Sequence, residues 1–191
     1  MDRKRIATGV SAALNAPLIT VVAFAMLIWH LDAPNSPLLI GIAAFFGCVL
    51  PIVTALAMLR LNIIDDIYAE ERDSRYIPFL WTDLFYLAGI VALNLANAPP
   101  AVIALMSCYF VNGLVLLLIT FKYKISIHAS GVSGPVTALV YIIGLTMIPL
   151  FLFLIPVAWA RVELDAHTKW QVTAGAVVTG LLTWLQMSLW L

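Results

Sequence analysis

The feature that most constrains this chain is a series of six long apolar runs separated by short polar breaks. Each run is close to the length of about 20 residues that an α-helix needs to cross a bilayer. The chain is 63% hydrophobic and only 10% charged, a composition that excludes an ordinary soluble domain. We predict an all-α, polytopic transmembrane helical bundle of six or seven crossings, forming one domain over residues 1–191. The predicted apolar runs are Ala13–His30, Pro37–Leu59, Ile77–Leu95, Pro100–Phe121, Gly134–Ala160 and Trp170–Leu191.

The remaining composition says little about partners. The formal net charge is zero, so the chain has no basic excess that would favour binding to nucleic acid. Cys48 and Cys108 are isolated within apolar runs, which predicts buried thiols and neither a disulfide nor a metal-binding pair. The basic N-terminus and the apolar stretch after it resemble a signal peptide. Because the later runs are also apolar, we expect a retained first helix.

The fifth apolar run could form one tilted helix or two short helices that fold back as a hairpin. Pro149 favours a break, because proline cannot donate a backbone hydrogen bond and disfavours helix in the residue before it. The hairpin has helices over Ser126–Leu145 and Ile148–Leu164, with a turn near Met147–Pro149. It gives seven crossings and puts all ten Lys and Arg residues on one side of the membrane, whereas a single helix would divide them. The positive-inside rule therefore favours the hairpin and a cytoplasmic N-terminus.

On that topology three polar segments meet at the predicted cytoplasmic face. They are residues 62–78, 121–134 and 160–175, and two of the three histidines, His128 and His167, lie in them. Arginine and lysine bind phosphate oxygens, and histidine can act as nucleophile or proton donor near neutral pH. Together these residue types favour a site for a phosphate ester, although each basic residue alone also fits a topology anchor at a helix end.

Residues 160–175 resemble the third signature of the type 2 phosphatidic acid phosphatase superfamily. In that signature Ser-Arg is followed after five residues by His and after three more by Asp. Arg161 and His167 keep the spacing, while Ala160 replaces the serine and Gln171 replaces the aspartate. The small residues that follow, "AGAVVTG", resemble the helix that continues the motif in the family.

Two weaker resemblances lie upstream, in the order that the family has. The second signature, Pro-Ser-Gly-His, is matched by Ser126 and His128 in "ISIH", with isoleucines in place of Pro and Gly. The first, a Lys followed seven residues later by Arg-Pro, corresponds only to "RDSRYIP", with Arg72, Arg75 and Pro78 in altered spacing. The resemblance covers about residues 72–191 and is that of a divergent small membrane member, with a phosphatase-like core at about 60–191.

The resemblance implies hydrolysis of a lipid or isoprenoid (di)phosphate through a phosphohistidine, with no metal and no cofactor. His167 would attack phosphorus, and His128 would protonate the leaving oxygen. Gln171 would orient His167 through its amide oxygen, as the family's aspartate does, but without the charge. The residues implied to hold the phosphate oxygens are Arg161, Arg72, Arg75, Lys122, Lys124 and Ser126.

Two other function classes fit parts of the sequence. Asn62, Asp66 and Glu70 are four residues apart, as on one face of a helix, and resemble the first Mg²⁺-diphosphate motif of UbiA-type prenyltransferases. Those enzymes need a second aspartate-rich motif, for which only Glu163 and Asp165 are candidates here. A non-enzymatic lipid-binding membrane subunit is the third class.

Asp83 lies within the third apolar run, where an ionisable residue marks a functional or pairing position. We expect it to pair with Arg75 or Arg161. The sequence as a whole predicts a hydrolase of lipid metabolism in the cytoplasmic membrane, surrounded by membrane lipids. Its predicted substrate is a lipid phosphate or polyprenyl (di)phosphate at the cytoplasmic leaflet, with the lipid tail between helices.

Overall fold

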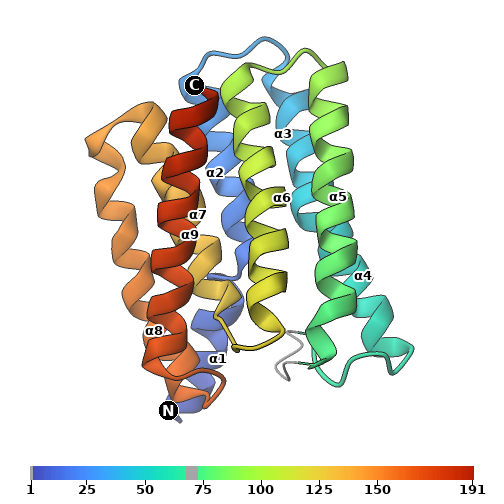
Figure 1. The fold of residues 1–191 in the computed structure, drawn as a ribbon, viewed down its shortest axis with the longest axis vertical. Coiled ribbons are helices and arrows are strands. Elements are labelled where there is room, and N and C mark those ends of the chain that lie inside the picture. Colours follow the sequence, from blue (N-terminus) through green and yellow to red (C-terminus); the bar gives the residue numbers. More distant parts are fainter. Residues whose placement is uncertain (1, 68–72) are drawn as a thin grey trace.

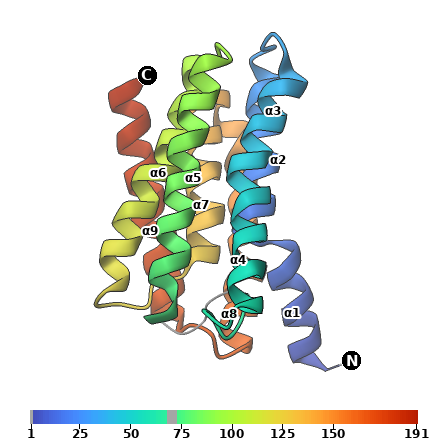
Figure 2. The same cartoon turned by 90° about the vertical axis from the view of Figure 1, so that its right-hand side faces the viewer.

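A computed structural model of the chain describes residues 2–67 and 73–191. Figures 1 and 2 show a bundle of long helices that run side by side between two ends of the molecule, with the N-terminus at one end and the C-terminus at the other. Within the described residues, five helical segments are long and apolar enough to cross a membrane, or six when the bent pair α1–α2 counts as one span. The predicted all-α, multi-pass membrane architecture is therefore confirmed.

The elements follow the predicted apolar runs closely. Ser36–Arg60 forms one continuous span from α3 to α4, and Leu145–Glu163 forms another that ends with α8. The helix α7 is also apolar but has only 17 residues. The described elements are α1 (Arg3–Ala13), α2 (Ala16–His30), α3 (Ser36–Ala44), a π-helical turn (Phe45–Val49), α4 (Leu50–Arg60), a 3₁₀ turn (Asp73–Arg75), α5 (Tyr76–Leu95), α6 (Pro100–Thr120), α7 (Ile127–Ile143), a 3₁₀ segment (Leu145–Phe153), α8 (Leu154–Glu163) and α9 (Lys169–Trp190).

The first predicted helix begins earlier than expected and is broken. The basic N-terminal segment is itself the helix α1, which meets α2 at an angle of 42°. The break has a local cause, because the Asn15 side chain accepts a hydrogen bond from the backbone N–H of Leu18 and starts a new helix there. Pro17 in the first turn of α2 fits the same position, since its missing N–H would have no helical partner.

The hairpin predicted for the fifth run is present, but its turn lies earlier than predicted. Helix α7 ends at Ile143, and the chain reverses at Gly144, not at Met147–Pro149. Gly144 has φ of 115°, a conformation that glycine adopts without the steric penalty of a side chain. Pro149 instead lies inside the following 3₁₀ segment, which packs back against α7.

Helices α7 and α9 pack closely because small residues face each other along their interface. Ser130 Oγ donates to the carbonyl of Gly175 at 3.1 Å, and Ser133 Oγ donates to the carbonyl of Ala176 at 2.6 Å. A Cβ at Gly175 would collide with the backbone carbonyl of Ser126. This close approach, of the kind that small residues allow between membrane helices, holds the start of α7 beside the second turn of α9.

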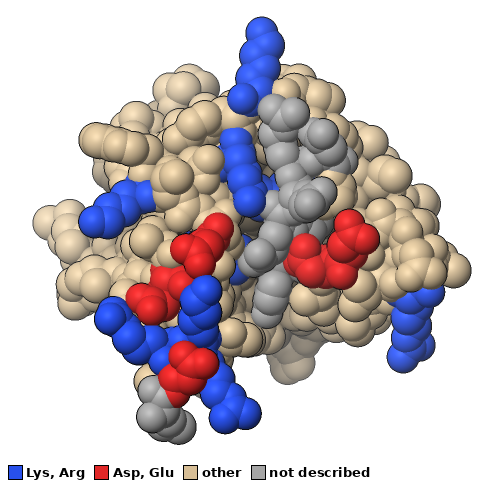
Figure 3. Space-filling view, turned by 90° about the horizontal axis from the view of Figure 1, so that it is seen from below, with Lys and Arg blue, Asp and Glu red and all other residues tan. Residues whose placement is uncertain are grey.

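One end of the bundle, which we call the basic end, carries the positive charge of the protein. It comprises the N-terminus and the α4–α5, α6–α7 and α8–α9 connections, which lie together at the lower end in Figure 1. Arg72 is outside the described residues, and the other nine of the ten Lys and Arg residues lie in these segments or at the helix ends beside them. Figure 3 shows Lys and Arg side chains on this face together with acidic side chains.

Candidate active site

Six polar side chains from six separate segments meet just inside the basic end. We call them the histidine cluster. The group includes both arginines that are buried among the described residues, Arg75 and Arg161, each only 2% exposed. Burying such groups away from water is costly unless they have hydrogen-bond partners, so their position calls for a specific arrangement. The cluster consists of Ser11 on α1, Arg75 before α5, His128 on α7, Arg161 on α8, His167 in the α8–α9 connection and Gln171 on α9.

The start of α9 fixes the orientation of His167. The Gln171 side-chain oxygen accepts a hydrogen bond from the backbone N–H of Thr168 at 3.0 Å, and the Thr168 hydroxyl accepts one from the N–H of Gln171 at 3.3 Å. This reciprocal capping box identifies which end of the Gln171 amide is the oxygen, because a backbone N–H can only donate.

The same oxygen lies 3.3 Å from Nδ1 of His167. Because an amide oxygen can only accept, Nδ1 of His167 carries the proton, and Nε2 of the neutral ring keeps its lone pair. The Nε2 atom lies 3.5 Å from a terminal guanidinium nitrogen of Arg75. The Gln171 oxygen thus lies where it can orient His167, and the lone pair of His167 is directed toward the cluster.

Arg161 and His128 are linked through a serine of the first helix. Arg161 donates to Ser11 Oγ at 3.0 Å, and the same oxygen lies 3.3 Å from Nε2 of His128. Since the guanidinium can only donate, the Ser11 hydroxyl can direct its own proton to Nε2 of His128. His128 also lies close enough to Arg75, Arg161 and His167 to interact with them electrostatically.

The cluster is a region of positive potential. Arg75 is anchored by its hydrogen bond to the backbone carbonyl of Ile125 at 3.0 Å. Burial, and after it the positive charges of Arg75, Arg161 and Lys124, lower the pKa of His167 from 6.5 to about 3. His167 is therefore neutral at physiological pH, and the field around it favours an anion.

Five of the predicted site residues belong to the histidine cluster, and the other four have different positions. Ser126 is fully buried, and its hydroxyl accepts from the N–H of Ala129, so it caps α7. Lys124 acts on His167 through its charge. Lys122 is exposed in the α6–α7 connection, and Arg72 lies outside the described residues.

Ser11 is the cluster residue that sequence reasoning missed. It is 1% exposed and connects Arg161 with His128, although it is 117 residues from His128 in sequence. Helix α1 is tied to the α8 end by two exposed ion pairs, Arg3–Glu163 at 3.3 Å and Lys4–Asp165 at 3.0 Å. A single serine in the basic N-terminal helix gives no sequence signal of this role, because the role depends on how α1 docks.

The structure also corrects two expectations about acidic residues. Asn62 has φ of 55° in a non-helical segment after α4, so Asn62 and Asp66 do not form the predicted helical face, and Glu70 lies outside the described residues. Neither carboxylate oxygen of Asp83 has a hydrogen-bond partner among the described residues, so the expected pairs with Arg75 and Arg161 are not formed.

Searches of the described residues for three or more His, Cys, Asp or Glu side chains placed to hold a metal ion find none. Comparisons with protein-family models, with curated proteins and with solved structures find no match to this chain. Any statement about function therefore depends on the chemistry of the site itself. That chemistry is a neutral imidazole with its lone pair at Nε2, a second imidazole, and two buried guanidinium groups around them.

Proposed function

We propose that this protein is a membrane-embedded lipid phosphatase that forms a phosphohistidine on His167. The observation that carries the proposal is the pair of hydrogen bonds made by the Gln171 oxygen, which leave the lone pair of His167 at Nε2 facing Arg75. An unprotonated imidazole nitrogen is the nucleophile such a reaction needs. The resemblance of the Arg161–His167 spacing to the type 2 phosphatidic acid phosphatase superfamily supports the same chemistry.

In the first step Nε2 of His167 attacks phosphorus, and the bond from phosphorus to the lipid oxygen breaks with its electron pair on that oxygen. His128, whose Nε2 lies beside Ser11, protonates the leaving oxygen. The anionic phosphate offsets the arginine charges near His128, which favours the protonated ring in the complex. Arg75 and Arg161 bind the phosphoryl oxygens, whose charge they stabilise in the transition state.

In the second step a water molecule attacks the phosphohistidine. His128, now neutral, accepts the proton of the water as the bond between phosphorus and His167 breaks, and inorganic phosphate leaves. Gln171 keeps the tautomer of His167 correct but supplies no negative charge, so a positive charge that develops on the ring is stabilised less than it would be by a carboxylate. We expect a modest turnover rate for that reason.

The positive-inside rule places the basic end, and with it the histidine cluster, at the cytoplasmic leaflet. The substrate would be a lipid phosphate or polyprenyl (di)phosphate with its phosphate in the cluster and its tail in the apolar surroundings of the helices. The cluster residues come from α1, α7, α8, α9 and the loops before α5 and α9, so the site depends on the packing of helices far apart in the chain.

Phosphate release from purified protein tests this proposal directly. We expect release from polyprenyl phosphates, polyprenyl diphosphates or diacylglycerol phosphate, inhibition by vanadate, and full activity in EDTA. Substrate labelled with ³²P should leave acid-labile label on the wild type, and none on His167→Ala. The matched control is His30→Ala. It removes the exposed histidine at the last residue of α2, at the end of the bundle opposite the histidine cluster, and it should behave as the wild type. Absence of labelling and release with every substrate would overturn the proposal in favour of a lipid-binding subunit, and a requirement for Mg²⁺ would favour the prenyltransferase class.

A further inference from the structure

A buried carboxylate without hydrogen-bond partners lies inside the bundle, away from the histidine cluster. Asp83 on α5 is 3% exposed, and both of its oxygens lack a hydrogen-bond partner among the described residues. Leaving a carboxylate in this state is costly in an apolar environment, and ionisable residues at membrane depth usually serve a function.

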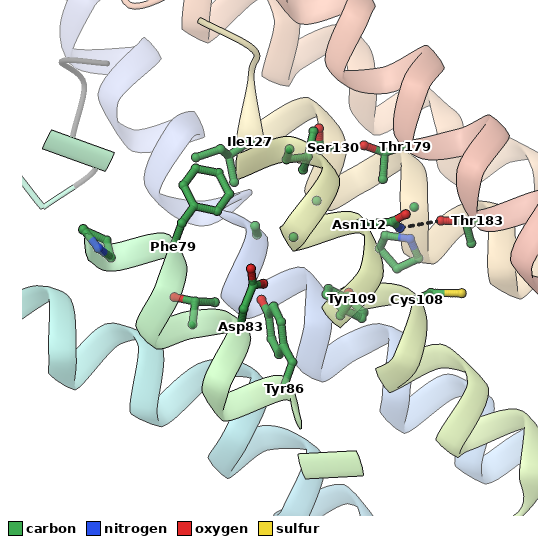
Figure 4. A pocket seen from close by; sticks show the side chains of 18 of the residues that line it. Phe79, Asp83, Tyr86, Cys108, Tyr109, Asn112, Ile127, Ser130, Thr179 and Thr183 are labelled. Carbon is green, nitrogen blue, oxygen red and sulfur yellow. Dashed lines mark hydrogen bonds between the residues drawn. The ribbon is translucent and has the colours of Figure 1, made fainter. Parts of the chain in front are cut away.

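The Asp83 side chain points into a cavity of about 160 Å³ between α5, α6, α7 and α9. The Asp83 carboxylate lies against Gly113 on α6. A Cβ at Gly113 would collide with the Asp83 Oδ1 atom. Figure 4 shows Asp83 with the other lining side chains around the cavity. The packing of α5 against α6 thus makes room for this carboxylate.

The walls of the cavity are largely aromatic on the side of Asp83. Phe79 and Tyr86 lie one turn away from Asp83 on α5, and Tyr109 lies across from them on α6, with its ring centre 5.4 Å from that of Tyr86. On the opposite side Asn112 donates to the Thr183 hydroxyl at 2.9 Å. Aromatic rings around a carboxylate favour a cation, because the ring faces attract positive charge.

The cavity adjoins the histidine cluster but shares only Arg75 with it. Its lining includes Arg75 but not His128, Arg161 or His167. A plain hydrocarbon tail in this cavity would leave the carboxylate without a donor, so the cavity does not suit the tail of the proposed phosphate substrate. The missing element is a group that both donates hydrogen bonds and carries positive charge.

We propose that this cavity binds an amphipathic amine, whose protonated amino group pairs with the Asp83 carboxylate while its apolar part contacts the aromatic walls. A primary ammonium group has three donors and a charge that compensates the carboxylate, which a hydroxyl group does not. The site goes beyond the proposed phosphatase activity and does not depend on it.

Hexylamine and hexan-1-ol, which share an alkyl chain, test the proposal on the wild-type protein in a neutral detergent. Equilibrium dialysis with labelled ligand should show saturable binding of hexylamine and much weaker binding of the alcohol, and only hexylamine should raise the thermal unfolding midpoint. Asp83→Asn keeps the shape of the side chain but removes the charge, and it should weaken amine binding by about 30-fold or more, the usual cost of losing one partner of a buried charge pair.

Gly113→Ala should also weaken amine binding, because the added methyl group displaces the carboxylate. His167→Ala should leave amine binding unchanged, so the amine site and the phosphatase proposal can fail separately. Equal binding of hexylamine and hexan-1-ol by the wild type would overturn the proposal even if Asp83→Asn does not fold. Undiminished amine binding by a folded Asp83→Asn protein would overturn it as well.

Discussion

Replacing Gln171 by glutamate should raise the pKa of His167, because it puts a negative charge where the structure has a neutral amide oxygen. Glutamate has the length of glutamine, so one carboxylate oxygen can take the place of the oxygen that lies 3.3 Å from Nδ1 of His167. The other contact of that oxygen, with the N–H of Thr168, also suits a carboxylate, since Glu is a common residue at this position of a capping box.

The size of the effect follows from the position of His167. Burial and the charges of Arg75, Arg161 and Lys124 lower its pKa from 6.5 to about 3. An opposite charge within hydrogen-bonding distance typically shifts a pKa by about 1 to 3 units, so the pKa in Gln171→Glu should be about 4 to 6. Turnover should rise in the same variant, because the carboxylate stabilises positive charge that develops on the ring during attack.

The lowered pKa of His167 should also make the folded protein less stable as the pH falls. In the wild type the folded pKa of His167 is below the unfolded value, so its contribution to stability is complete above about pH 6.5 and is lost as pH falls toward 3. At 1.36 kcal/mol per pKa unit the whole loss is at most about 5 kcal/mol. Gln171→Glu should recover roughly 1 to 4 kcal/mol of this loss.

Nuclear magnetic resonance of ¹³C-labelled histidine gives the pKa directly, and the chain has only three histidines to assign. Thermal unfolding between pH 4 and 7 gives the stability. Thr173→Glu is a matched control, because it adds the same charge at an exposed position of α9 and should leave the pKa of His167 near the wild-type value. A wild-type pKa near 6.5, or the same pKa for His167 in the wild type and Gln171→Glu, would refute the reasoning.

Two further predictions concern Arg161 of the histidine cluster and the membrane topology. Arg161→Ala should lower turnover by about 10²-fold or more, whereas Lys169→Ala, on the exposed start of α9, should change it little; equal small effects in a phosphate-release assay would show that Arg161 is only a topology anchor. Cysteines introduced at the exposed positions Lys122 and Lys169 should react with a membrane-impermeant maleimide from one side of sealed vesicles, and a cysteine at Asp32 only from the other side. Labelling of Lys122→Cys and Lys169→Cys from opposite sides would contradict the seven-pass arrangement.

The turn at Gly144 is a feature of the fold that the local sequence did not predict correctly. The apolar runs could be predicted from the sequence because a membrane helix must satisfy its backbone hydrogen bonds within itself. The length and composition of such a helix are therefore set locally. The exact position of the reversal was not predicted, since Pro149 suggested the break but the chain reverses at Gly144, whose φ of 115° suits glycine. Asn62 shows the same limit, because its four-residue spacing to Asp66 suggested a helix that the chain does not form there.

The candidate site divides in the same way. The sequence by itself determined the spacing of Arg161, His167 and Gln171, because these residues lie within one short connection and a capping box whose geometry is local. Only the tertiary structure decided that Ser11 joins Arg161 to His128, and that Asp83 faces a cavity instead of an arginine. Those contacts join helices that are far apart in the chain. They depend on which helix faces can approach one another, and small residues on α6, α7 and α9 decide this. No local sequence pattern encodes such an approach.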